Sequence, residues 1–345
     1  MKRHGSLFDE IVSLENIELA YCKARRNKTW QKKVKRIDRR REKYLACLHD
    51  KLVAGTYYTS PYKQKRIYEP KERIIYVLPF WPDRICQHAV MNVIAPIWDR
   101  LFISDSYACR DGKGQHAGSK RCMQFVRRNK YVLQCDVSKF YPNINHEVLM
   151  QIIARKIKDK RVLALLDEVV RSIGGETNVP IGNYTSQWFG NLYLNELDML
   201  MKHKYHVKDY MRYCDDFLLF SNDKAFLRGM ADIIRDFLGE KLKLKLSKCA
   251  LYPTSQGVDF LGYRHFPSGK ILVRKSTAKR IKKELKAIPW KVKHGRMTRE
   301  QALSTVCSYR GWIQWANAHH LAVSTHLYEL EKELREGGIE HEVMA

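Results

Sequence analysis

The stretch Tyr210-Met211-Arg212-Tyr213-Cys214-Asp215-Asp216-Phe217-Leu218-Leu219-Phe220 places two adjacent acids between two apolar runs. This pattern predicts a strand, a tip that carries both carboxylates, and a second strand. Adjacent carboxylates repel each other, so a hairpin that carries them favours a bound cation. Another apolar run, Tyr131-Val132-Leu133-Gln134-Cys135, ends in Asp136. Carboxylates on neighbouring strands can hold two Mg²⁺ ions roughly 3.5–4 Å apart for in-line phosphoryl or nucleotidyl transfer.

The charge of the chain indicates a polyanionic partner. Of its 345 residues, 63 are Lys or Arg and 37 are Asp or Glu, so the formal net charge is +26. Residues 23–43 hold twelve Lys or Arg and two acids, and residues 270–299 hold twelve and one. Two separated basic blocks suit a nucleic-acid backbone held at two places. The alternative interpretation is a solvated surface.

The cysteine and histidine patterns favour no metal site. Nine cysteines are present without a C-x-x-C pair, so a zinc ribbon or a disulfide scaffold is not expected. His203 and His206, like His319 and His320, have ligand spacing but no Cys or carboxylate set beside them. No apolar run approaches the roughly 18 residues of a membrane span, and no apolar segment follows the basic start. We therefore expect no membrane association and a cytoplasmic protein.

The order of the expected elements is typical of an α+β fold with strands scattered among helices. Helices are expected at residues 6–26, 30–54, 83–98, 184–203 and 223–240, after Asn145, and from Ser276 onward. Strands are expected at residues 74–78, 131–135, 243–252 and 258–264. Asp83 is a candidate N-cap for the helix that follows it. Together, the Tyr-x-Asp-Asp hairpin, the strand that ends in Asp136 and the following Phe140-Tyr141 indicate a template-directed polymerase.

The succession of motifs resembles reverse transcriptases of the bacterial, group II intron-related kind, from about Ile67 to about Leu321. The matching segments are Glu69-Pro70-Lys71-x-Arg73-Ile74, Asp83-Arg84-Ile85-Cys86-Gln87, Ser106 to Gly114, Asp136 with Phe140-Tyr141, Tyr213 to Asp216, Leu246-Ser247-Lys248, Phe260-Leu261-Gly262-Tyr263 and Ser308 to Trp312. The resemblance implies a right-hand polymerase of fingers, palm and thumb. Its expected parts are a helical basic N-terminal extension (1–55), fingers (56–130 with part of 145–182), palm (131–265) and thumb (266–345).

One motif points to a narrower group. Many reverse transcriptases have Gln-Gly-x-x-x-Ser-Pro, whereas this chain has Ile181-Gly182-Asn183-Tyr184-Thr185-Ser186-Gln187. The variant resembles reverse transcriptases of diversity-generating retroelements, which are encoded by bacteria or phages. That resemblance implies copying of a template-repeat RNA into cDNA with errors at adenines. It also implies a small basic accessory variability determinant protein as a partner.

The resemblance and the chemistry of the residues together give the expected site. Catalysis is expected from Asp136, Asp215, Asp216 and Lys248, the last as a general acid toward pyrophosphate. The metal set is Asp136, Val137, Asp215 and Asp216, with two Mg²⁺ ions, or Mn²⁺, as cofactors. The dNTP would contact Lys71, Arg73, Arg110, Tyr141, Ile181, Gly182 and Gln187, with Tyr141 excluding a 2′-hydroxyl.

Template RNA and primer or cDNA are expected to bind basic and hairpin residues. The basic ones are Lys32, Lys33, Lys35, Arg36, Arg39, Arg40, Arg41, Lys279, Lys282 and Lys283. The expected primer grip is Phe260, Leu261 and Gly262. Two alternatives stay open: another bacterial reverse transcriptase of the retron, abortive-infection or free-standing group II-like kind, and a polymerase-like RNA-binding scaffold without turnover.

Overall fold

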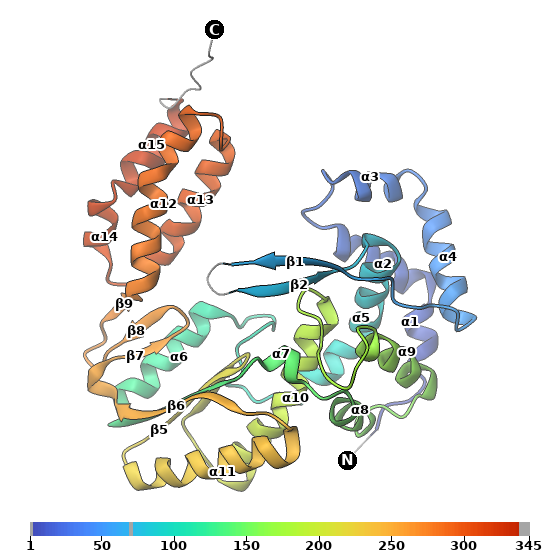
Figure 1. The fold of residues 1–345 in the computed structure, drawn as a ribbon, viewed down its shortest axis with the longest axis horizontal. Helices are drawn as coiled ribbons and strands as arrows, with labels where there is room; N and C mark the ends of the chain where they lie inside the picture. The colour runs from blue at the N-terminus through green and yellow to red at the C-terminus, as the bar shows by residue number, and fades with distance from the viewer. Residues whose placement is uncertain (1–2, 69–71, 338–345) are drawn as a thin grey trace. The chain divides into compact units, whose positions relative to one another are not determined.

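The computed structural model describes residues 3–68 and 72–337, and it contains the expected mixture of helices and strands (Figure 1). This composition confirms the α+β class. The chain forms two compact units. The first comprises Met1–Asp111, Gln134–Phe217 and Gly229–Ala250, and the second comprises Gly112–Leu133, Leu218–Arg228 and Leu251–Ala345.

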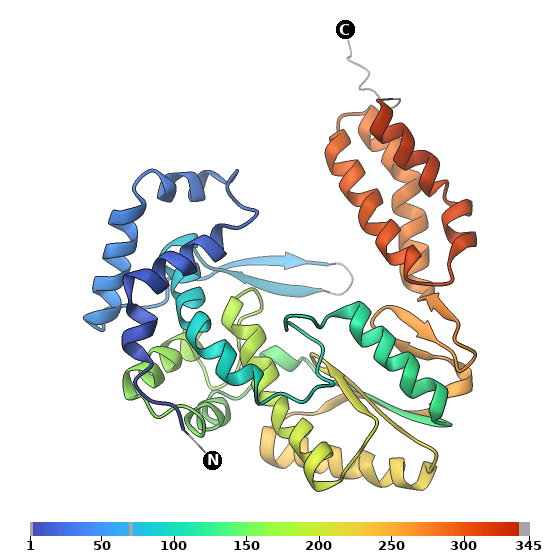
Figure 2. The ribbon, with the colours of Figure 1, turned by 180° about the vertical axis from the view of Figure 1, so that it is seen from behind.

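The basic N-terminal segment forms short helices where two long ones were expected. They are α1 (Phe8–Val12), α2 (Leu14–Arg25), α3 (Lys32–Asp38) and α4 (Arg41–Val53). Ser13 has an extended backbone that ends α1, and its hydroxyl accepts a hydrogen bond from the Asn16 N–H to begin α2. Arg40, with φ −138°, separates α3 from α4. Both views show α2 lying along α5 (Ile85–Asp99) (Figures 1 and 2).

A two-stranded antiparallel ribbon follows, made of β1 (Lys63–Ile67) and β2 (Arg73–Val77). The strand expected at 74–78 is therefore confirmed. The expected N-cap role of Asp83 is wrong, because Asp83 lies inside the short helical segment η1 (Phe80–Arg84), which is kinked at the extended Trp81 and runs on into α5. The buried Asp83 carboxylate instead accepts hydrogen bonds of 3.0 Å from the Tyr57 hydroxyl and from the Ser60 N–H.

A four-stranded sheet of order β4-β5-β3-β6 carries the acids that the sequence singles out. Its strands are β3 (Tyr131–Val137), β4 (Tyr210–Tyr213), β5 (Asp216–Ser221) and β6 (Leu246–Pro253). Leu133 and Phe217 are almost fully buried, as expected for strands covered by other elements. Helix α11 (Lys224–Leu242) runs along one face of the sheet (Figures 1 and 2). The predicted hairpin and the predicted strand before Asp136 are thus confirmed.

Four helices lie between β3 and β4 in the chain. They are α7 (Phe140–Asn143), α8 (His146–Ala154), α9 (Lys160–Arg171) and α10 (Tyr184–Met199), which continues as η2 (Leu200–Lys204). The Asn145 and Asp159 side chains cap α8 and α9. Helix α10 is buried along most of its length, including polar residues such as Asn191 and Asp198. Such polar residues require partners inside the protein.

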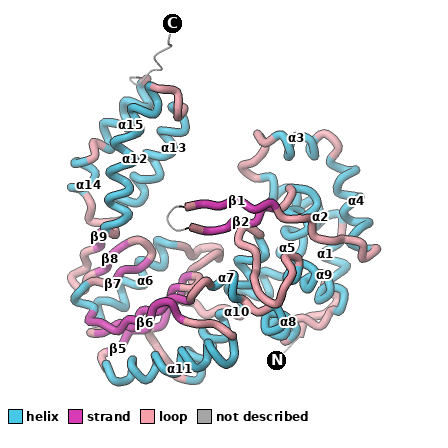
Figure 3. The backbone as a smooth tube through the Cα atoms, in the orientation of Figure 1, coloured by secondary structure: helices cyan, strands magenta, loops and turns pink. Residues whose placement is uncertain are grey.

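The second unit combines a small sheet with a helical bundle. Its elements are α6 (Gln115–Arg128), η3 (Thr254–Gln256), β7 (Val258–Phe260), β8 (Tyr263–His265), β9 (Ile271–Val273), α12 (Lys275–Lys293), α13 (Arg299–Gln314), α14 (His319–Ser324) and α15 (Leu327–Glu336). The three strands pair in the order β7-β8-β9, and Figure 3 shows that α12 to α15 form an all-helical part.

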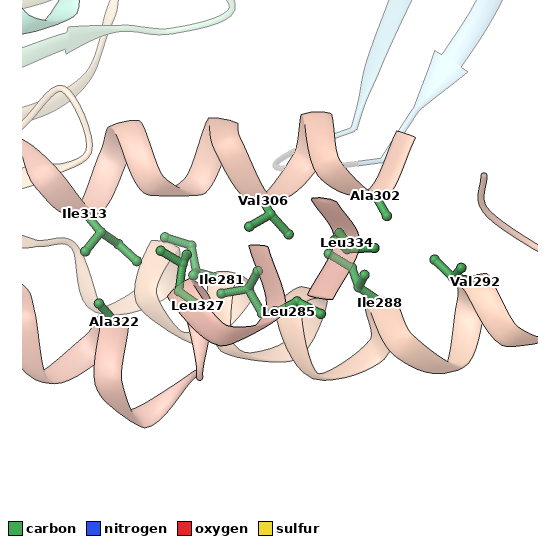
Figure 4. Close-up of a cluster of buried hydrophobic side chains, with 11 residues drawn as sticks. Ile281, Leu285, Ile288, Val292, Ala302, Val306, Ile313, Ala322, Leu327 and Leu334 are labelled. Carbon is green, nitrogen blue, oxygen red and sulfur yellow. The ribbon is translucent and has the colours of Figure 1, made fainter. Parts of the chain in front are cut away.

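The bundle has its own apolar core. Ile281, Leu285 and Ile288 of α12 meet Val306 of α13 and Leu334 of α15 (Figure 4). Burial of each such side chain stabilises a fold by about 1.5–3 kcal/mol, so this core accounts for the association of the helices. Within the described ranges, no helix is long and apolar enough to cross a membrane.

Candidate active site

The tip between β4 and β5 presents the adjacent acids. Cys214 adopts a left-handed backbone with φ +53°, Asp215 follows in the turn, and Asp216 is the first residue of β5. The Val137 N–H donates a 3.3 Å hydrogen bond to the main-chain oxygen of Asp215. This bond joins the end of β3 to the tip and brings Val137, an expected member of the metal set, beside Asp215.

Asp136 stands on β3, the strand that neighbours β5. The Ser247 hydroxyl, from β6, lies 2.5 Å from Asp136 Oδ2 and 3.1 Å from the Asp136 main-chain oxygen. Three strands therefore meet at these groups. Ser247 belongs to a segment that the sequence singled out, but its contact with Asp136 was not foreseen, because residues 111 positions apart meet only in the folded chain.

The surroundings of Asp216 disfavour the negative charge of its carboxylate. Burial raises the pKa of Asp216 to about 7, and the neighbouring Asp136 carboxylate adds to this, while Gln134 and Lys248 act in the opposite direction. Asp216 Oδ1 is buried and has no hydrogen-bond partner. A cation at this position would relieve the repulsion and satisfy the oxygen, so the residues fit a divalent metal ion.

The acids nevertheless do not form a complete set of metal ligands. Among the residues that the structure describes, no group of three or more His, Cys, Asp or Glu side chains is arranged to hold a metal ion. The fit to a metal therefore rests on the charge balance of Asp216 and Asp136. The roles expected for Asp136, Val137, Asp215 and Asp216 stay predictions.

Lys248, on β6, lies close to Asp216, and its role as a general acid stays a prediction. Its ammonium donates a 2.8 Å hydrogen bond to Gln134 Oε1 on β3. Gln134 in turn is hydrogen-bonded to Asp216, and the charge of Lys248 lowers the pKa of that carboxyl. Gln134 is not among the site residues expected from the sequence, because it is a single polar residue within an apolar strand.

Tyr141 lies close to the tip. Its ring contacts Phe140, with the centroids 5.1 Å apart, and a Cβ at Gly190 would stand 3.2 Å from the Tyr141 ring. Burial raises the pKa of the Tyr141 hydroxyl, and the nearby Cys214 and Asp215 contribute to the same shift. The structure thus brings Tyr141 close to Cys214 and Asp215, and its expected position beneath the sugar stays a prediction.

The motif that begins at Ile181 contacts the ribbon strand β2. The Tyr76 N–H donates a 2.8 Å hydrogen bond to the Ile181 main-chain oxygen. Gly182 has φ +122°, and a Cβ there would stand 2.4 Å from the Tyr76 main-chain oxygen. Glycine at this position is therefore required by the approach of β2. Gln187 is exposed in the first turns of α10.

The side chains expected to bind the triphosphate differ in their surroundings. Arg73 is exposed at the start of β2, and Lys71 lies outside the described residues. The expectation for Arg110 conflicts with the structure. Its guanidinium is 9% exposed, forms a 2.6 Å ion pair with Asp99, and donates to the main-chain oxygens of Ile103 and Ser106. It holds its own loop and has little surface left for a phosphate.

The expected nucleic-acid residues lie on exposed helical surfaces of each unit. In the first unit, Lys32, Lys33, Lys35, Arg36, Arg39, Arg40 and Arg41 are all exposed, and Arg41 is 3.3 Å from Glu18. In the second unit, Lys279, Lys282 and Lys283 are exposed on α12. Their expected contact with nucleic acid stays a prediction.

The expected primer grip is a tight turn between β7 and β8. Leu261 and Gly262 have φ of +55° and +82°, and Phe260 is fully buried. A Cβ at Gly262 would stand 2.5 Å from the Trp312 ring, and Gln115 Nε2 donates a 3.0 Å hydrogen bond to the Leu261 main-chain oxygen. The turn is held rigidly within its own unit.

Comparison with known proteins gives consistent similarities. The family described as "Reverse transcriptase (RNA-dependent DNA polymerase)" matches residues 63–265. Protein YkfC of Escherichia coli is 27% identical over 270 residues, which are 64% of this chain and 70% of YkfC. Group II intron-encoded protein LtrA of Lactococcus lactis is 23% identical over 286 residues, 61% of this chain and 48% of LtrA.

A solved structure supports the fold. The telomerase of Candida tropicalis, in complex with a TWJ fragment of telomeric RNA, aligns with a TM-score of 0.50 at 12% identity. The alignment covers 84% of this chain and 58% of the telomerase chain. This likeness agrees with the right-hand polymerase fold. The chain thus spans about half of the length of LtrA and somewhat more of the telomerase.

Proposed function

Because the chain belongs to the reverse transcriptase family, we propose that it is an RNA-directed DNA polymerase that extends a primer along an RNA template. The observation that carries the proposal is that Asp136 stands on β3, which neighbours β5, while Asp215 lies in the turn before β5 and Asp216 is its first residue. The raised pKa of Asp216 and its unpartnered oxygen support the proposal of a cation beside this carboxylate.

The residues of the chain divide the work of nucleotidyl transfer. Two Mg²⁺ ions, or Mn²⁺, held by Asp136, Val137, Asp215 and Asp216, would supply the charge that activates the primer hydroxyl and stabilises the leaving group. Lys248 would carry a proton at Nζ for the departing pyrophosphate. Tyr141 would lie beneath the sugar and exclude a 2′-hydroxyl. Arg73, with Lys71, would neutralise the triphosphate.

The parts of the right hand are assigned as part of this proposal. Helices α1 to α4 belong to a basic N-terminal extension (1–55), and β1, β2 and α5 belong to fingers (56–130 with part of 145–182). The palm is 131–265, with the primer grip at its end, and the thumb is 266–345. Exposed cations in the extension and the thumb suit a template and a primer strand.

Primer extension tests the function. A DNA primer annealed to an RNA template is incubated with the full chain, Mg²⁺ and dNTPs, and a parallel reaction lacks template. We expect products complementary to the template and none without it. Products without template would indicate an untemplated polymerase instead. Absence of extension with both Mg²⁺ and Mn²⁺, at protein concentrations that bind the RNA, would favour a silent RNA-binding scaffold.

We further propose that the enzyme is the mutagenic polymerase of a diversity-generating retroelement, copying a template-repeat RNA with errors at adenines together with a small basic accessory protein. The support is Ile181, where many relatives have Gln. Its main chain is fixed by Tyr76, and its side chain can neither donate nor accept a hydrogen bond. Losing one hydrogen bond of about 0.5–1.5 kcal/mol raises misincorporation roughly two- to tenfold.

Sequencing of cDNA made by Ile181→Gln and by the parent on one template tests this narrower role. We expect fewer errors opposite adenine in the variant, with polymerisation retained. Ile181→Val is the matched control, since it stays apolar and should keep the parental error rate. Equal adenine errors in Ile181→Gln would remove Ile181 from the mechanism. Faithful copying of adenine by the parent would favour another bacterial reverse transcriptase, in line with the similarity to YkfC and LtrA.

A further inference from the structure

Arg212 is a buried cation directly behind the acidic tip. It lies on β4, its side chain is fully buried, and so is that of its partner Asp198 on α10. Arg212 Nη2 lies 2.5 Å from Asp198 Oδ2, and Arg212 Nε lies 2.8 Å from Asp198 Oδ1. Removing two charges from water is unfavourable, so a buried ion pair is weak evidence for stability alone.

The remaining donors of Arg212 join α10 to the tip. Nη1 donates to the Cys214 main-chain oxygen at 3.0 Å and to Asn191 Oδ1 at 3.2 Å. Nη2 donates to the Asn191 main-chain oxygen at 3.3 Å. Cys214 has a left-handed backbone, which is unfavourable for a residue with a side chain, so the tip needs such support.

The partners of Arg212 are themselves held in place. Asp198 Oδ1 also accepts a 2.6 Å hydrogen bond from the Tyr210 hydroxyl. Asn191 Nδ2 donates to the Ala108 main-chain oxygen at 2.8 Å. The Arg212 N–H donates to the Asp105 main-chain oxygen at 3.0 Å. The guanidinium therefore has one arrangement, fixed from several directions.

We propose that Arg212, held by Asp198 and Asn191, is a positioning residue that fixes the Cys214 carbonyl and thereby the orientation of the Asp215 and Asp216 carboxylates. Arg212 acts through the main chain of the tip, where Asp215 and Asp216 follow Cys214 directly. The inference rests on the proposed polymerase function. In this proposal α10 is a rigid support. It carries Gln187 near its beginning, and its residues Asn191 and Asp198 hold the acidic tip through Arg212.

A double variant separates positioning from stability. Asp198→Leu with Arg212→Met replaces the ion pair by apolar side chains, an exchange that is often neutral for folding, whereas either single change leaves a buried charge. It also removes the donor to Cys214. We expect a melting temperature and an RNA affinity close to the parent's, a kcat lowered by about 10- to 100-fold, and a dNTP KM changed by less than about twofold.

The matched control is Asp232→Leu with Arg235→Met, which removes an exposed 2.6 Å pair on α11 and should keep parental kcat.

Mn²⁺ binding provides a readout that does not need turnover. Titration with Mn²⁺ followed by electron paramagnetic resonance should show weaker binding in the double variant. A folded double variant with parental kcat and parental Mn²⁺ affinity would overturn the proposal. If that variant does not fold, Arg212→Lys keeps a charge beside Asp198 but replaces the guanidinium donors to Cys214 and Asn191 by a single ammonium. Unchanged kcat and Mn²⁺ affinity in that variant would overturn the proposal equally. A parent that binds Mn²⁺ but extends no primer would refute the proposed function alone.

Discussion

The Ser247 hydroxyl lies 2.5 Å from Asp136 Oδ2, so β6 orients a carboxylate that stands on β3. A hydrogen bond to a charged carboxylate oxygen orients the carboxylate and is stronger than a hydrogen bond between neutral groups. The site therefore depends on side chains that the acidic motifs themselves do not contain.

Ser247→Ala should raise the Mg²⁺ concentration that gives half-maximal extension by about two- to tenfold, because an orienting hydrogen bond of about 0.5–1.5 kcal/mol is lost. Maximal extension at saturating Mg²⁺ should fall less. Ser247→Thr keeps the hydroxyl and serves as the control. The measurement is a Mg²⁺ titration of primer extension for the three proteins. Coinciding titration curves for Ser247→Ala and the parent would contradict an orienting role for Ser247.

Tyr141→Ala should admit ribonucleotides, because removal of the ring opens space beneath the sugar. Steric exclusion of a small group is worth about 1–3 kcal/mol, so the preference for dNTP over rNTP should fall by roughly 10- to 200-fold. Tyr141→Phe keeps the ring that contacts Phe140 and should retain the parental preference. Single-nucleotide incorporation of dNTP and rNTP gives the ratio. If that ratio is the same in Tyr141→Ala as in the parent, another residue is the gate.

The exposed cations of α3 and its end should bind RNA. Changing Lys32, Lys33, Arg36 and Arg39 to Ala leaves the buried Val34 and Ile37 in place, so the helix should remain folded. Each lost phosphate contact should reduce the salt slope of RNA binding by about 0.7–0.9.

An equal loss of charge on α11 provides the control for this prediction. The variant changes Lys224, Arg228, Arg235 and Lys241 to Ala, all of them exposed. RNA affinity is measured over a series of salt concentrations. The slope of log affinity against log salt concentration should differ from the parent's only in the α3 variant. A parental slope in the α3 variant would indicate that this surface binds a protein partner instead.

His265 should make the fold sensitive to acid. It is fully buried, with Nε2 2.7 Å from the Ser119 hydroxyl. Burial lowers its pKa from 6.5 to about 4, although the Val258 carbonyl acts in the opposite direction. The folded chain therefore binds fewer protons than the unfolded chain between these values. The resulting stability is present above pH 6.5 and is lost as the pH falls toward 4.

The loss should reach up to about 3 kcal/mol at the acid end of this window, at about 1.4 kcal/mol for each unit of pKa shift. Chemical denaturation at several pH values measures it. The variant His265→Gln retains hydrogen-bonding groups but does not titrate, so its unfolding free energy should fall less between pH 6.5 and 4. Parallel curves for the two proteins would show that His265 does not control this transition.

The sequence predicts the strands and long helices well, because their signals are local. The apolar runs around Asp215 and before Asp136 give β3, β4 and β5, and the periodic segment after Tyr184 gives α10. The expected N-terminal helices were too long, since a single capping residue such as Ser13 divides a segment whose periodicity continues on both sides.

The contacts of the site could not be predicted in the same way. Arg212 and Asp198 form a pair inside an apolar strand and a buried helix, and the only sequence signal is a charged residue where a hydrophobic one is expected. Arg110 was assigned to phosphates from its motif, whereas the fold pairs it with Asp99. Such partnerships depend on the tertiary arrangement of the chain.

The most direct test of the central claim is to measure RNA affinity and primer extension on the same preparation of Asp216→Asn. The exchange keeps the shape of the side chain and removes the charge next to Asp136, so metal binding at the reacting groups should fail while the distant basic surfaces still hold RNA. Asp232→Asn, at an exposed position on α11, is the control. The account predicts an RNA dissociation constant within about twofold of the parent's and no detectable extension. Extension by Asp216→Asn at the parental rate would contradict it.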